Sequence, residues 1–128
     1  LVMCHFERAL YADPEQDLNR LWWDLVERFQ LLHRPDGRDA PDWAAKIHIA
    51  AAPVYYHNYL LGSVLSCQLE REIIDACGRL VNERPAGEWL TERLFRPGNL
   101  LTWEALIEQA TGRPLSSDDF AAYVAVKV

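Results

Sequence analysis

The residues best suited to chemistry lie in one short stretch, and they are Lys46, His48, Tyr55, Tyr56, His57 and Tyr59. Phenol and imidazole groups at the mouth of an apolar helix can form a set of hydrogen-bond donors directed at a bound anion or a developing oxyanion. The plainer alternative is that the tyrosines are packed rings with satisfied hydroxyls and that His57 lies at the surface. Residue types alone leave both interpretations open.

The composition is that of a globular protein. Half of the 128 residues are hydrophobic, a quarter are charged, and five are tryptophan, which suffices for a core and argues against disorder. The formal net charge of −6 argues against nucleic acid or an anionic membrane as a partner, since either would prefer a basic face.

The cysteines Cys4, Cys67 and Cys77 form an odd set without CxxC spacing, which indicates neither a disulfide framework nor a zinc knuckle. Cys67 and Cys77 are interpreted as small core hydrophobes within apolar helices. This usage favours a reducing compartment, such as the cytoplasm.

The hydrophobic spacing in the first third of the chain predicts helices. One ends near Ala12, and Asp13-Pro14 predicts the start of the next, with Asp13 as N-cap. Residues 34–41 have the composition of a surface loop, and residues 42–45 predict a helical turn. The core-facing stripe of the second helix is expected to contain Leu18, Leu21, Trp22, Leu25, Val26, Phe29 and Leu32. His33 is expected near the end of that helix, at the negative pole of its dipole.

A long helix is expected from about Pro53 to Cys77, closed by Gly78. Its first half, from Tyr55 to Leu65, is apolar nearly all round and is therefore predicted to be buried on most sides. Gly62 within it suggests close packing of another helix.

Three further helices are predicted after Gly78. One spans residues 88–95, one is capped by Thr102 and ended by Gly112, and the last is capped within residues 116–119. No segment alternates with a period of two, so the expected fold class is all-α, a bundle or array of about five to seven helices. We expect one all-helical domain or fragment over residues 1–128. Because Leu1 begins a helical stripe without a cap, we expect a C-terminal piece of a larger helical protein.

The arrangement Lys46-Ile47-His48, a short spacer and then Tyr56-x-x-Tyr59 resembles the C-terminal part of the angiotensin-converting-enzyme-like zinc metallopeptidases, the peptidyl-dipeptidase A family. Three flanking segments are similar to that family in order and spacing: Leu21-Trp22-Trp23-Asp24-Leu25, Phe95-Arg96-Pro97-Gly98, and residues 107–114 with their Thr-Gly turn.

The resemblance implies an enzyme in which zinc activates water and a C-terminal dipeptide is released from a peptide substrate. It implies that Lys46 and Tyr56 hold the substrate's terminal carboxylate. It also implies that His48 donates to a peptide carbonyl next to the scissile bond and that Tyr59 stabilises the oxyanion.

The spacer between His48 and Tyr56 is one residue longer than in the animal enzymes, so Tyr55 and Asn58 form an alternative register for the same roles. We prefer Tyr56 and Tyr59 because they keep the Tyr-x-x-Tyr spacing. Asn58 then replaces an arginine that binds chloride in animal members, which argues against chloride dependence.

The family's His-Glu-x-x-His motif does not occur in the sequence. We therefore expect zinc in a parent enzyme, none in this chain, and no hydrolysis by this chain alone. The expected partners are a peptide substrate, the missing N-terminal portion and a second copy bound through exposed apolar helices. The alternative is a free-standing all-helical interaction module without catalysis.

Overall fold

A computed structural model describes residues 1–126. Over this range it contains seven α-helices and no strand, which confirms the all-helical fold class. The chain divides into two compact units, Leu1–Leu60 and Leu61–Val128, and the boundary falls within helix α4 (His57–Cys77). In the part of the chain that is described, no helix combines the length and apolar character needed to cross a membrane.

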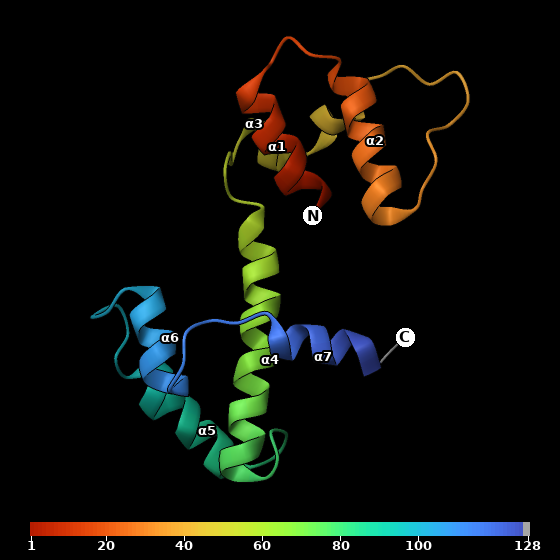
Figure 1. The fold of residues 1–128 in the computed structure, drawn as a ribbon. Helices are drawn as coiled ribbons and strands as arrows, with labels where there is room; N and C mark the ends of the chain where they lie inside the picture. The colour runs from red at the N-terminus through yellow and green to blue at the C-terminus, as the bar shows by residue number, and fades with distance from the viewer. Residues whose placement is uncertain (127–128) are drawn as a thin grey trace. The chain divides into compact units, whose positions relative to one another are not determined.

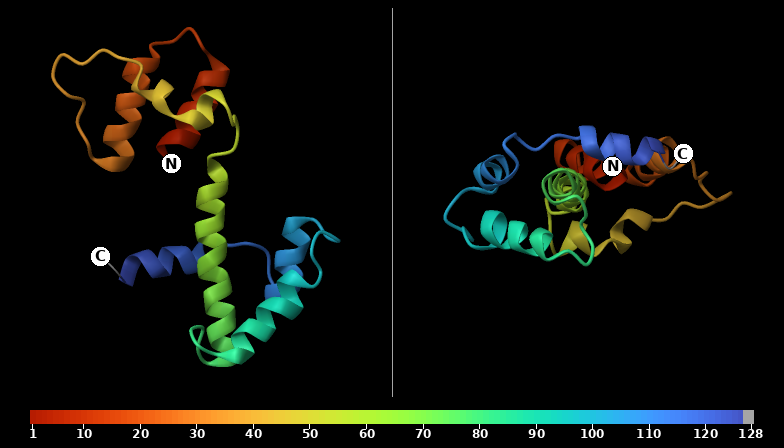
Figure 2. Two further views of the ribbon diagram at one scale, coloured as in Figure 1. Left: turned by 180° about the vertical axis from the view of Figure 1, so that it is seen from behind. Right: turned by 90° about the horizontal axis from the view of Figure 1, so that it is seen from below.

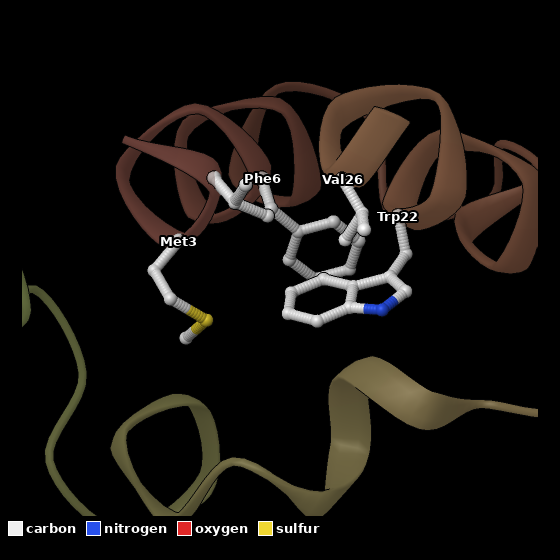
Figure 3. Packing of buried hydrophobic residues seen from close by; sticks show 5 residues of the cluster. Met3, Phe6, Trp22 and Val26 are labelled. Carbon is white, nitrogen blue, oxygen red and sulfur yellow. The ribbon is translucent and has the colours of Figure 1, made fainter. Parts of the chain in front are cut away.

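The core of the first unit lies between α1 (Val2–Ala12) and α2 (Leu18–Gln30), which pack side by side (Figure 1). Phe6 is fully buried, and its ring meets Trp22 edge-on with 5.4 Å between centroids. Figure 3 shows Phe6 and Met3 from α1 facing Trp22 and Val26 from α2. Burying side chains of this size contributes roughly 1.5–3 kcal/mol each, so this cluster is the main support of the unit.

The predicted start of α2 at Asp13 is wrong, because the cap is Asp17. The Asp17 carboxylate accepts a hydrogen bond from the backbone N–H of Arg20 at 3.0 Å. Asp13 instead ends α1, and its carboxylate accepts from the N–H of Glu15 at 3.1 Å in a local turn. Aspartate can stabilise a turn as readily as a helix start, so the Asp-Pro signal was ambiguous.

The predicted end of α2 is also too late. Leu31 adopts a left-handed conformation with φ 59° and ends the helix, so Leu32 is exposed rather than part of the core stripe. His33 consequently lies beyond the helix, where its Nδ1 is 2.7 Å from the Glu27 carboxylate.

The loop that follows α2 is a surface loop, as predicted, and it leads into the predicted helical turn η1 (Asp42–Ala45). Asp42 fixes this junction: its carboxylate accepts two hydrogen bonds from the Arg38 guanidinium and one from the Trp23 indole at 3.2 Å. The hydrogen bonds from Arg38 hold the pKa of Asp42 below its usual value, against an opposing contribution from partial desolvation.

Helix α4 ends at Cys77 as predicted, and Gly78 follows with φ 83°. It begins at His57 rather than Pro53, because residues 47–50 form a separate short helix, α3 (Ile47–Ala50), and an irregular turn follows. The predicted burial of its first half on most sides is not found within residues 1–126, since Tyr59 is 55% exposed and Val64 is the one buried residue between Tyr55 and Leu65. Among the described residues nothing packs within 4 Å of a Cβ built on Gly62, so the predicted close packing there is absent.

The second unit contains the remaining predicted helices. Figure 2 shows α5 (Arg84–Leu90) continuing into a π-helical turn, η2 (Thr91–Phe95), so the helix predicted over residues 88–95 begins earlier than expected. Pro85 in the first turn explains the earlier start, because a first-turn proline loses no intrahelical bond. The predicted caps of α6 (Trp103–Thr111) are confirmed: Thr102 accepts from the N–H of Ala105, and Gly112 ends the helix with φ 76°.

The connection between α6 and α7 (Asp118–Val126) is tied to α4 by Gln68, which is fully buried. The Gln68 amide nitrogen donates to the Thr111 hydroxyl at 3.0 Å and to the Pro114 carbonyl at 3.3 Å. Its amide oxygen accepts from the N–H of Ser116 at 2.9 Å. The Ser116 hydroxyl accepts from the N–H of Asp118, as the predicted cap requires.

Candidate functional site

Lys46 lies between η1 and α3, with its side chain exposed. Within residues 1–126 its side-chain ammonium has no hydrogen-bond or ion-pair partner. An ammonium group without an internal counter-ion is available to an external anion, which is the property that a carboxylate-binding residue needs.

His48, on the short helix α3, brings the tyrosines together. Its ring centroid is 4.9 Å from that of Tyr56 and 5.5 Å from that of Tyr59, with both tyrosines edge-on. Tyr55 lies parallel to it at 6.3 Å. The two tyrosines at the start of α4 also meet each other, with 5.3 Å between Tyr56 and Tyr59. These four residues, His48, Tyr55, Tyr56 and Tyr59, are called the tyrosine cluster below.

A hydrogen bond joins two members of the cluster: His48 Nε2 and the Tyr59 hydroxyl are 3.1 Å apart. The direction of this bond depends on the histidine tautomer. If Nε2 carries the proton, it donates to the Tyr59 oxygen. In the neutral tautomer with the proton on Nδ1, Nε2 instead accepts from the Tyr59 hydroxyl.

Of the alternative register, Tyr55 lies in the cluster, with its ring 5.9 Å from that of Tyr59. The backbone N–H of Asn58 donates to the Tyr55 carbonyl at 3.0 Å.

His57 lies apart from the cluster and lines a recess of about 350 Å³ on the other side of the turn. Its neighbours along that recess include Cys4, Arg8 and Tyr11 from α1. His57 is exposed, in agreement with the plainer sequence interpretation of this residue.

The turn between α3 and α4 depends on a residue that the sequence analysis missed. Val54 adopts φ 55°, a left-handed conformation that costs a side chain with a Cβ about 1–2 kcal/mol. Its N–H donates to the carboxylate of Glu7, which is 7% exposed. The Tyr11 hydroxyl donates to the same oxygen at 3.1 Å. Helical spacing could have indicated that Glu7 is buried, because Glu7 lies four residues after Met3 and therefore on the same, core-facing side of α1.

The described residues of this chain do not form a metal centre. No group of three or more histidine, cysteine, aspartate or glutamate side chains within residues 1–126 could hold an ion. The residues present therefore do not fit a zinc site.

Residues 47–128 match the family described as carboxypeptidase Taq (M32) metallopeptidases, and the chain belongs to that family. The match includes the whole tyrosine cluster and begins one residue after Lys46.

The chain is also similar to "Thermostable carboxypeptidase 1" of Pyrococcus furiosus, with 26% identity over 136 aligned positions. The alignment covers 99% of this chain and 27% of that relative, so the chain spans about a quarter of the relative's length. No solved structure matches the chain.

These matches confirm that the chain is of metallopeptidase and carboxypeptidase type. They do not support the narrower assignment to the angiotensin-converting-enzyme-like family. The resemblance rested mainly on the short Lys-x-His…Tyr-x-x-Tyr pattern, which is too little sequence to distinguish one helical metallopeptidase family from another.

Proposed function

We propose that this chain is the substrate-binding part of a zinc-dependent carboxypeptidase that shortens peptides from the C-terminus. The observation that carries the proposal is the tyrosine cluster, in which His48 and Tyr59 are hydrogen-bonded, together with the exposed Lys46 two residues before His48 in the sequence. Membership of a metallopeptidase family supports the same reaction class.

In this proposal Lys46 and Tyr56 bind the terminal carboxylate of the substrate. A cation together with a neutral phenol suits a monoanion, because the ammonium supplies the opposite charge and the phenol donates a directional hydrogen bond. His48 donates to a peptide carbonyl near the scissile bond. These contacts fix the position of the peptide before any bond is broken.

Tyr59 is proposed to donate to the carbonyl oxygen that becomes an oxyanion during attack. A fixed donor at that position stabilises the transition state more than the bound substrate. Its hydrogen bond to His48 orients the phenol, provided that Nε2 carries the proton in that bond.

The zinc ligands and the general base of the complete enzyme are proposed to lie outside this chain, since its described residues offer no metal site. The chain alone is then expected to bind peptides without hydrolysing them. In the complete enzyme, analysis of the products distinguishes two reactions. One releases a single C-terminal amino acid, and the other releases a dipeptide, as the peptidyl-dipeptidase resemblance implies.

The test is binding of a free-acid peptide and of its C-terminal amide to the isolated chain, measured by titration calorimetry. The free acid should bind more tightly, and Lys46→Ala should remove the preference, since a charged hydrogen bond is worth about 1.5–3 kcal/mol. Arg20→Ala is the matched control, because it removes an equally exposed cation whose partner is Asp24. If wild-type protein bound neither peptide, the interaction-module alternative would replace the proposal.

A further inference from the structure

The cluster depends on how the chain turns between α3 and α4, and Val54 is the unusual residue of that turn. Its φ of 55° is uncommon for a β-branched residue. The Val54 side chain is 62% exposed, so packing of that side chain does not account for the conformation. A contact of the main chain must stabilise it instead.

That contact comes from α1. The backbone N–H of Val54 donates to a carboxylate oxygen of Glu7, 47 residues earlier in the chain. Glu7 is more than nine-tenths buried, and the turn together with Tyr11 satisfies its carboxylate oxygen. Hydrogen bonds to a charged acceptor are stronger than neutral ones, and a buried carboxylate without donors is costly.

We propose that Glu7 is a positioning residue that sets the geometry of the tyrosine cluster through the backbone of Val54. Tyr55 and Tyr56 follow Val54 directly, and Tyr59 lies in the first turn of α4. The conformation of Val54 therefore determines whether these rings contact His48. Glu7 itself does not touch the rings. The role in substrate binding rests on the function proposed above, whereas the role in geometry does not.

The geometry is tested by NMR on the 128-residue chain. In the wild type, the rings of His48 and Tyr59 should show mutual nuclear Overhauser effects, and the His48 ring protons should be shifted by the surrounding tyrosines. Glu7→Ala should abolish both signals while the Phe6–Trp22 effects of the α1–α2 core persist. Glu7→Gln keeps an acceptor oxygen and should retain them.

Two further variants separate positioning from loss of stability. Tyr11→Phe removes the second donor to Glu7 and should leave the cluster signals intact. Glycine adopts positive φ readily, so adding Val54→Gly to Glu7→Ala should restore the signals. If Glu7→Ala fails to fold, Glu7→Asp withdraws the acceptor oxygen by one methylene and should disperse the cluster with the core preserved. Val54→Pro removes the N–H and also fixes φ at about −65°, so it tests whether the turn conformation sets the cluster.

Persistence of the His48–Tyr59 effects in Glu7→Ala, or in Val54→Pro, would overturn the proposal, and so would their loss in Tyr11→Phe. Binding of the free-acid peptide should weaken about 5- to 30-fold in Glu7→Ala and recover in Glu7→Gln. If wild-type protein binds no peptide, the proposed function fails, but the NMR comparison still decides the positioning role.

Discussion

His48 and Tyr59 lie at the centre of the tyrosine cluster, because the ring of each contacts the other three members and a hydrogen bond joins the two. His48 reaches the tyrosines from a short helix that leads into the α3–α4 turn, and side-chain type alone does not reveal that place. Because of the hydrogen bond, a substrate that displaces either residue should also affect the other.

Tyr59→Phe in the complete enzyme should lower kcat by roughly 10²–10³ and leave KM little changed, because the lost donor acts mainly on the transition state. Steady-state kinetics on a free-acid peptide measures both constants. Tyr123→Phe, on α7, is the control for loss of a phenol elsewhere. If Tyr55→Phe abolished kcat while Tyr59→Phe did not, the preferred register would be wrong and the oxyanion role would move with it.

At the scale of elements, the ends of helices differ most from expectation. Gly78 and Gly112 mark helix ends correctly because each adopts positive φ, which glycine does at no steric cost. Leu31 and Val54 adopt positive φ too, but leucine and valine are not residue types that favour this conformation. At Val54 the conformation depends on a tertiary contact, the buried carboxylate of Glu7, so local sequence rules place the start of α4 several residues too early.

The junction after α2 should respond to acid through Asp42. Because the pKa of Asp42 is lowered in the folded state, its stabilisation is present above the unfolded pKa and is lost as pH falls through the lower folded pKa. Asp42→Asn should therefore be less stable than wild type at neutral pH, and the difference should narrow on acidification.

Urea unfolding at neutral pH and at several acidic values, followed by circular dichroism, measures this difference. Asp36→Asn is the matched control, since within residues 1–126 the Asp36 carboxylate has no ion-pair partner. An Asp42→Asn variant that lost stability equally at every pH would show that the side chain acts by shape rather than charge.

At the scale of the whole molecule, the all-helical class followed from hydrophobic spacing, whereas burial did not. Tyr55, Tyr59 and Leu60 were expected inside and are exposed in this chain. An apolar sequence pattern predicts that a helix face will be buried, but it does not identify the element that buries it. Residues 1–126 do not bury this face of α4.

We expect that the exposed apolar side chains at the start of α4 cause the isolated chain to self-associate, because contiguous apolar patches of several hundred Å² usually find a partner. Analytical ultracentrifugation at increasing concentration should show dimers or larger species. Leu60→Ser should weaken the association, and Leu100→Ser, an exposed leucine outside α4, should not. A monomer at the highest concentration would contradict the expectation.

The buried amide of Gln68 has a consequence for how this sequence can vary. Two of its partners are main-chain groups, the Pro114 carbonyl and the Ser116 N–H, which residues of many types could offer equally well. Gln68 itself must both donate and accept, which a carboxylate cannot do when ionised and an aliphatic chain cannot do at all. Substitutions should therefore be tolerated along much of the α6–α7 connection and resisted at a single distant position on α4.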